Sequence, residues 1–144
     1  MKRFLAIAIA GLSLGAALPG AADQGLIDYR QAVYKSIGGH MSAIAGVLKR
    51  EAPHVGDLPM HARGIAELAP LTLHLFPEAS ADGRTEALAA IWEDPDAFDE
   101  KRSDFIEAAT AFGAVADADM DTYVGAFRTL GGTCKGCHDN FKAD

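Results

Sequence analysis

The sequence predicts an all-α fold, an antiparallel four-helix bundle. In four long stretches, apolar residues recur at seven-residue spacing with further apolar positions between them, a pattern typical of helices that face a bundle interior. Short connections rich in Pro, Gly and Asp join the stretches, and short connections favour antiparallel neighbours. The chain is 49% hydrophobic but only 8% aromatic, and it lacks the alternating pattern of β-strands.

Residues 1–22 are predicted to be a secretory signal peptide. Lys2 and Arg3 precede an apolar run over 4–18, and small residues at 20–22 precede Asp23, which is the pattern of a cleavable leader. The alternative is an uncleaved anchor, but the run is shorter than the ~20 residues of a spanning helix. We therefore expect cleavage after Ala22, a mature domain over 23–144 without a membrane span, and a periplasmic location.

The first two predicted helices span 26–49 and 59–75. The inward stripe of the first helix comprises Ile27, Arg30, Tyr34, Ile37, Met41, Ile44 and Leu48. Pro70 lies inside the second stretch and predicts a kink there. The composition of 77–84, with Pro, Ser, Asp and Gly, predicts a loop after it.

The third predicted helix has a short helical lead-in over 85–92. Its main part begins at Asp94, an N-cap residue that is followed by proline at the first helical position. Aromatic residues then continue at heptad spacing, at Phe98, Phe105 and Phe112. Gly113 is expected to weaken this helix slightly, because glycine is a poor helix former.

The fourth predicted helix begins near Asp117 or Asp119, because acidic side chains favour a helix start. Its inward lines contain Met120, Tyr123, Phe127, Leu130, Cys134, Cys137 and Phe141. Both cysteines are therefore expected to face the bundle interior, and so is any group that they hold.

The segment Cys134-Lys135-Gly136-Cys137-His138 is the attachment pattern of a c-type haem. Residues three and four apart share one helix face, so the two thiols can add to the two vinyl groups on one porphyrin edge. The imidazole of His138 can then reach the iron as an axial ligand. We expect one covalently attached haem c, held by Cys134, Cys137 and His138.

Two other chemistries use cysteine pairs. A secreted pair can form a disulfide, but a redox-active C-x-x-C motif is typical of a βαβ setting, which this sequence does not predict. A structural zinc site needs four ligands, and the chain has only these two cysteines. Haem attachment is the interpretation that the pattern favours.

Few other residues are candidates for the haem site. Met41 is the methionine placed to reach the same iron, although core packing is the more ordinary role of such a residue. Arg30 occupies an inward position where an unpaired charge is unfavourable. We expect it to pair with a haem propionate or to extend to solvent at the bundle end. Surface or structural roles are expected for His40, His54, His61 and His74.

The charge of the chain limits its partners. The formal net charge is -7 and the isoelectric point is about 5.1. Nucleic acid is not expected as a partner, because phosphate binding needs a basic face.

The sequence resembles the cytochrome c′ family, the class II c-type cytochromes. The resemblance rests on CKGCHDNF over 134–141, close to the C-terminus. It also rests on RQAVY over 30–34 and IGGHM over 37–41 in the first helix, and on IWEDP over 91–95 in the third. These segments are distributed along nearly the whole mature chain.

The resemblance implies a left-handed bundle, usually a homodimer built on the first two helices, and five-coordinate iron bound by His138. It implies that the position four residues after Arg30, here Tyr34, faces a vacant distal side, where six-coordinate relatives have Met. It also implies a basic residue four positions after His138, usually Arg and here Lys142. Lysine lacks the planar fork of arginine.

From this resemblance we expect a non-enzymatic, periplasmic monohaem cytochrome. It would transfer single electrons with periplasmic redox proteins and bind small diatomic gases, NO and CO, at a vacant site capped by Tyr34. One alternative is a six-coordinate low-spin electron shuttle, with Met41 or another side chain as sixth ligand. A second is a small peroxidase, which needs a distal acid–base group that the sequence does not assign.

Overall fold

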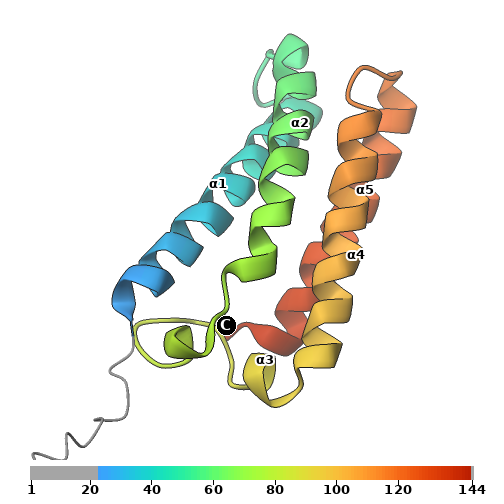
Figure 1. Ribbon diagram of the computed structural model, residues 1–144. Coiled ribbons are helices and arrows are strands. Elements are labelled where there is room, and N and C mark those ends of the chain that lie inside the picture. The colour runs from blue at the N-terminus through green and yellow to red at the C-terminus, as the bar shows by residue number, and fades with distance from the viewer. Residues whose placement is uncertain (1–22, 144) are drawn as a thin grey trace, which may run out of the picture.

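The computed structural model of the protein describes residues 23–143, and the predicted signal peptide lies outside this range. Four long helices form an antiparallel bundle (Figure 1), namely α1 (Gln24–Leu48), α2 (Leu58–Leu68), α4 (Pro95–Ala114) and α5 (Met120–Phe141). The short α3 (Ala90–Glu93) lies at the lower end of the bundle in Figure 1, beside the end of α5. Within 23–143 there is no β-strand, which confirms the predicted all-α four-helix fold.

Three of the four long helices begin at an aspartate that caps them. The carboxylate of Asp23 accepts hydrogen bonds from two backbone N–H groups of the first turn of α1, and Asp94 and Asp119 each accept one at the start of α4 and α5. These bonds satisfy N–H groups that have no partner inside the helix. The predicted cap at Asp94 is therefore confirmed, and of the two predicted starts of the last helix, Asp119 is the correct one.

The structure corrects two predicted helical segments. The second helix does not continue through a kink to residue 75: α2 ends at Leu68, and a 3-10 helix (Ala69–His74) follows it. Pro70 has no N–H to donate and crowds the preceding turn, so it ends the α-helix. The lead-in over 85–92 is helical only from Ala90, because the residues before it make backbone hydrogen bonds to the end of α5 instead.

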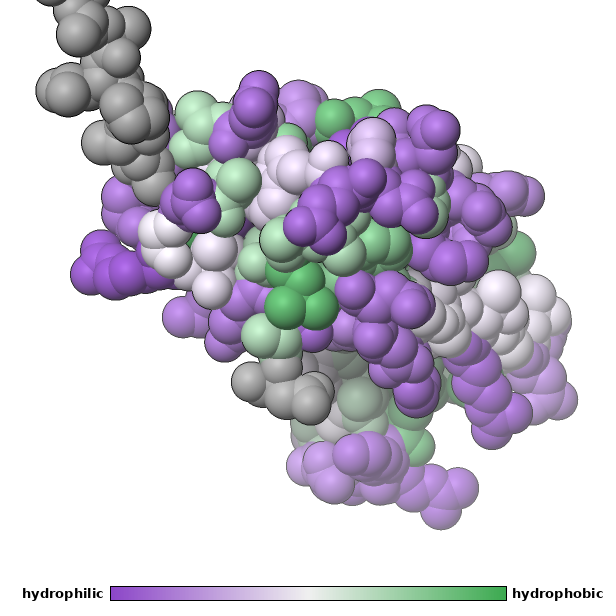
Figure 2. All heavy atoms as spheres, turned by 90° about the horizontal axis from the view of Figure 1, so that it is seen from below, coloured by the Kyte–Doolittle hydropathy of each residue, from purple (hydrophilic) through white to green (hydrophobic). Residues whose placement is uncertain are grey.

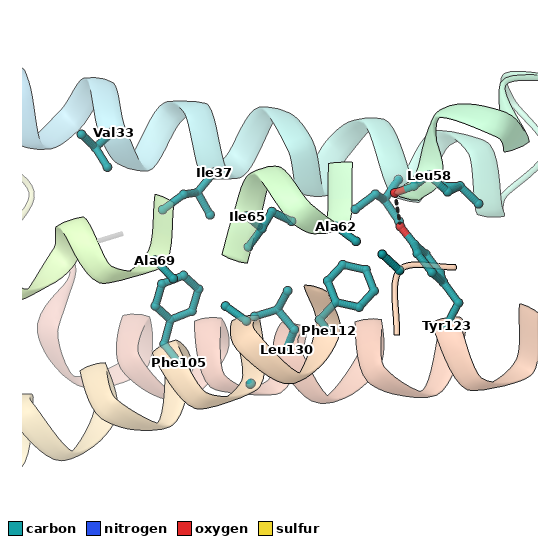
Figure 3. Packing of buried hydrophobic residues seen from close by; sticks show 14 of the residues in the cluster. Val33, Ile37, Leu58, Ala62, Ile65, Ala69, Phe105, Phe112, Tyr123 and Leu130 are labelled. Atoms are coloured by element: carbon teal, nitrogen blue, oxygen red, sulfur yellow. Dashed lines mark hydrogen bonds between the residues drawn. The ribbon is translucent and has the colours of Figure 1, made fainter. Parts of the chain in front are cut away.

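All four long helices contribute to one buried core (Figure 3), which runs from Val33 and Phe105 in the lower half of the bundle to Leu58 and Tyr123 in the upper half. Ile44, Ile65, Phe112 and Leu130 are completely buried there, one from each helix. The Tyr123 hydroxyl, also buried, donates a 2.9 Å hydrogen bond to the carbonyl oxygen of Leu58. Burial raises the pKa of Tyr123 to about 12, so this hydroxyl keeps its proton and the core contains no uncompensated charge.

Glycine allows one close helix contact in this core. A Cβ atom placed on Gly113 of α4 would lie 2.6 Å from the Cβ of Ala66 on α2. Gly113 is therefore the residue that lets α4 approach α2, an advantage that offsets its low helix propensity. None of the helices within 23–143 has the length and apolarity needed to cross a membrane.

Candidate functional site

A cavity of about 760 Å³ lies between α1 and α5 in the lower half of the bundle. The other neighbouring helix pairs pack against each other, whereas α1 and α5 are held apart here. Its back wall is aromatic, with Phe76, Phe98 and Phe105. These rings pack edge to face where they meet, as at Phe76 and Phe98, whose centroids are 4.8 Å apart. The space is large and mostly apolar.

The two cysteines line this cavity from α5, as the inward stripe predicted. Cys134 and Cys137 are half-buried and carry free thiols. Burial raises the pKa of both thiols, and the neighbouring Cys134 raises that of Cys137 further. Both groups are therefore neutral thiols in the folded chain, which is the form that adds across a vinyl double bond with its own proton.

His138 follows at the rim of the same cavity. Its side chain is exposed on one side and lines the cavity on the other. Partial burial and the nearby Lys142 ammonium lower the pKa of this imidazole. The neutral form, with a free lone pair, is therefore favoured, and that form is the one that binds iron.

Lys142 lies beside His138, as its four-residue spacing predicted. Its ammonium forms a 2.9 Å ion pair with the carboxylate of Glu86, and its backbone N–H donates to the carbonyl oxygen of His138. The charge of Lys142 acts on His138 through space, because the side chain is bonded to Glu86 and not to the imidazole ring.

The residues around the cavity fit a covalently bound haem. Two free thiols and a neutral imidazole stand at the i, i+3 and i+4 positions of one helix, opposite an apolar wall that can cover a porphyrin. Four cationic side chains but only one carboxylate, that of Glu86, line the space, and these cations are Arg30, Lys101, Arg102 and Lys142. Among the described residues, neighbouring carboxylates form ion pairs with three of these cations, all but Arg30. The N–H donors of the four side chains suit a ring with two propionates. Among residues 23–143, no three His, Cys, Asp or Glu side chains are grouped as a metal site would require.

Tyr34 lines the α1 wall of the cavity, opposite the helix of the cysteines and His138. Its ring packs edge to face on Phe76, with centroids 6.0 Å apart. Burial is the main cause that raises the pKa of Tyr34 above its ordinary value, and the thiol of Cys137 adds to it. The side chain is therefore a neutral phenol, which can donate a hydrogen bond but is a poor source of the phenolate that would bind iron.

Arg30 is buried, with 3% of its surface exposed, so the alternative in which it extends to solvent is wrong. Both terminal nitrogens donate to the loop over 75–85, to the carbonyl oxygens of Leu75 and Ser80 and to the hydroxyls of Ser80 and Thr85, at 2.8–3.4 Å. The guanidinium also lies over the Phe76 ring, 4.6 Å from its centroid. Arg30 thus holds the loop that forms the lower wall of the cavity, and it places a positive charge in that wall.

Sequence reasoning missed Lys101 and Arg102 as residues of this site. Arg102 donates to the carbonyl oxygens at the end of the 3-10 helix, 3.2 Å away at Leu73, and its guanidinium lies 5.4 Å from the centre of the Phe98 ring. Its heptad position between Phe98 and Phe105 was a usable signal for its inward direction. Only the fold, however, reveals that this stretch of α4 faces a cavity.

The four other histidines are structural or exposed, as expected. Nδ1 of His40 on α1 and Nδ1 of His61 on α2 are 2.8 Å apart and share one hydrogen bond, and both rings are half-buried. A Cβ on Gly64 would lie 2.9 Å from the His40 ring, so this glycine makes room for the pair. His54 and His74 are exposed.

Comparison with known proteins gives one consistent family. Residues 25–142 match the family model described as Cytochrome C′. The cytochrome c′ of Rhodospirillum rubrum is 34% identical over 147 residues, which cover all of both chains. The solved structure of cytochrome c prime from Shewanella frigidimarina is 34% identical and superimposes with a TM-score of 0.79, covering 84% of this chain and 96% of that one.

A further solved structure is the nitric oxide complex of a variant of cytochrome c prime from Alcaligenes xylosoxidans. It is 27% identical to this chain and has a TM-score of 0.75, covering 84% of this chain and 96% of that one. Sequence and fold therefore agree, and the chain belongs to the cytochrome c′ family, whose members carry one covalently attached haem c.

Proposed function

We propose that this protein is a periplasmic monohaem cytochrome that exchanges single electrons and binds small diatomic gases, NO or CO, beside Tyr34. The haem is held by Cys134 and Cys137, with His138 as the axial ligand. When bound, the haem supplies an iron that alternates between the ferric and ferrous states and an axial position for a gas. The protein is not expected to be an enzyme, since no distal acid–base pair can be assigned among the cavity residues.

The observation that carries the proposal is the position and protonation of Tyr34. It lines the wall opposite the proximal residues, where a side-chain ligand for the other face of the iron would have to stand. Its raised pKa keeps it a neutral phenol, so it leaves the axial position to an outside ligand and can donate a hydrogen bond to it. Nitric oxide complexes of an Alcaligenes xylosoxidans relative support the same chemistry.

The charged residues of the cavity have a separate role in this proposal. Arg30, Lys101 and Arg102 supply positive charge to a site that accepts the two propionates of a haem. Arg30 does so while it holds the loop over 75–85. The ring of Tyr34 narrows the space on the α1 side of the cavity, which favours small gases over larger ligands.

A specific observation keeps the six-coordinate electron shuttle as a second candidate. Met41 also lines the cavity from α1 and is half-buried, and a methionine thioether is a familiar axial ligand. Met41 lies seven residues after Tyr34, which is about 10 Å along the helix at 1.5 Å per residue. As a sixth ligand, Met41 would therefore have to act from a level of α1 well above that of Tyr34.

Optical spectra of the purified holoprotein, with and without carbon monoxide, test the proposal. A broad ferrous Soret band that sharpens with carbon monoxide is the expected result. Sharp α and β bands that carbon monoxide does not alter would overturn the gas-binding proposal and favour the electron shuttle. The Met41→Leu variant then separates the two cases, because it changes the ferric spectrum only if Met41 is the sixth ligand.

The location and assembly of the protein are part of the same proposal. The leader over 1–22 supports export and cleavage after Ala22. Large apolar side chains exposed on α1 and α2, which are Leu26, Tyr29 and Met60, support a homodimer built on these two helices. N-terminal sequencing of the mature protein tests the first point, and light scattering during size-exclusion chromatography tests the second.

A further inference from the structure

The cavity has two different ends. Its lower end is lined by Arg30, Thr85, Glu86 and Lys142, and its upper end by Gly38, Met41, Ser42 and Gly131. The residues that attach the haem, from 134 to 138, lie below the upper end. Gly131 precedes His138 by seven residues, so the two residues are about 10 Å apart along the axis of α5. The upper end thus extends beyond the attachment residues.

The lower end is closed by backbone hydrogen bonds. The Leu88 N–H donates to the carbonyl oxygen of Phe141 at 3.0 Å, and the Ala143 N–H donates to that of Glu86 at 2.8 Å. The Glu86–Lys142 ion pair reinforces this contact, and Arg30 fixes the adjoining loop. Opening this end requires several hydrogen bonds to break together. Figure 2 shows the bundle from below, with a small apolar area surrounded by hydrophilic side chains.

At the upper end, no backbone hydrogen bond or ion pair between the lining residues closes the cavity. None of its four residues carries a charge, and Gly38 and Ser42 are exposed, so this end reaches the protein surface. A Cβ atom on Gly38 or on Gly131 would meet no atom of the protein within 4 Å. These two glycines, one on each side of the space between α1 and α5, therefore leave room that a side chain would fill.

Other glycines of the bundle show that this room is not needed for helix packing. At Gly64 and Gly113 an added Cβ would meet a neighbouring helix at 2.9 and 2.6 Å, so those two residues permit close contact. Gly38 and Gly131 are not needed for a close contact between helices, because α1 and α5 are apart at this level. Glycine inside a helix is unfavourable relative to alanine, and close packing does not offset this cost at Gly38 or Gly131.

We propose that the upper end is the passage by which small uncharged gases reach the haem cavity, and that Gly38 and Gly131 set its width. The inference rests on the proposed gas binding, which it extends with a route and two residues that control the rate. A side chain at either position would narrow the passage without touching Tyr34 or His138. It would therefore slow ligand association and leave the bound state as it is.

Flash photolysis of the carbon monoxide complex of the holoprotein tests this inference. The variants are Gly38→Leu and Gly131→Leu, and the matched controls are Gly39→Leu and Gly132→Leu. Each control is the next residue on the same helix and also has open space at its Cβ, but it does not line the cavity. We expect bimolecular recombination to be at least tenfold slower in the cavity-lining variants and within twofold of the parent in the controls.

The spectrum of the carbon monoxide complex is recorded for every variant and is expected to be unchanged. Gly38→Ala and Gly131→Ala, which favour the helix, give a smaller slowing in the same direction if a leucine variant does not fold. Parent-like rates in all cavity-lining variants would overturn the passage and leave gas binding intact. A parent protein that binds no carbon monoxide would overturn the proposed function and this inference with it.

Discussion

The upper and lower halves of the bundle use the same four helices for different purposes. In the upper half the side chains of all four helices meet, and residues such as Ile44, Phe112 and Leu130 are completely buried (Figure 3). In the lower half a cavity lies between α1 and α5. The loop over 75–85, which Arg30 holds by hydrogen bonds, completes its wall. The comparison indicates that the upper half supplies stability, while the lower half gives up packing so that it can hold a cofactor.

The strongest test of this division removes the attachment residues alone. The double variant Cys134→Ala, Cys137→Ala is expected to lose all covalently attached haem, because no thiol remains to add to the vinyl groups. Cys134 packs only at the edge of the large core, and no completely buried core residue is changed, so most of the helical signal in circular dichroism should persist. Acid–acetone extraction followed by haem staining of the polypeptide measures the attachment.

Lys135→Ala is the control for this variant, since Lys135 lies between the cysteines and is exposed. It should retain the haem. Collapse of the helical signal in the double cysteine variant would show that the two halves do not fold independently of the cofactor.

The next largest effect is expected in the upper half. Phe112→Ala removes a completely buried ring and should lower the free energy of unfolding by about 3–5 kcal/mol, while the optical spectrum of the haem stays unchanged. Denaturant titration of the holoprotein measures the loss. Met120→Ala, at a side chain that is 44% exposed, should stay within about 0.5 kcal/mol of the parent. A comparable loss in both variants would contradict the assignment of stability to this core.

A pair of glycines sharpens the same comparison, because equal substitutions should act in opposite directions. Gly113→Ala forces a Cβ against Ala66 at 2.6 Å and should destabilise the protein by about 1–3 kcal/mol. Gly132→Ala adds a Cβ in open space on exposed helix and should stabilise it by up to about 1 kcal/mol. Thermal unfolding of both variants decides the point, and two shifts of the same sign would contradict it.

The smallest expected effect concerns pH and the His40–His61 pair. Burial, and then the charge of His61, lower the pKa of His40 in the folded state. The unfolded chain therefore binds more protons once the pH falls below the ordinary histidine value of about 6.5, and stability declines as the pH falls further. At higher pH one ring donates to the other, whereas two protonated rings would bring two N–H donors face to face.

Urea unfolding midpoints between pH 5 and 8 measure this dependence. His40→Gln should flatten the decline below about pH 6.5, and His74→Gln, at an exposed residue, should leave it as in the parent. If His40→Gln keeps the full decline, the pair is not its cause.

Local patterns were sufficient to predict much of the fold and which residues of α5 line the cavity. The heptad stripes predicted the four helices and the inward direction of Arg30, Cys134 and Cys137. This was possible because the spacing of apolar residues a few positions apart is enough to identify the inward face of a helix. Asp94 and Asp119 as helix starts were also readable, since a cap acts within three residues. Pro70 was recognised as a disruption, but whether it kinks or ends a helix depends on what packs beside it.

Contacts between distant residues were not predictable in the same way. The sequence alone predicted the attachment chemistry, in which two thiols and an imidazole within five residues share one helix face. The tertiary structure decided that Arg30 binds the loop over 75–85 and that residues 86–88 pair with the end of α5. It also decided that Gly113 lies against Ala66 and that His40 meets His61. Each of these depends on how four helices are placed relative to one another, and a free energy shared among many weak contacts sets that placement.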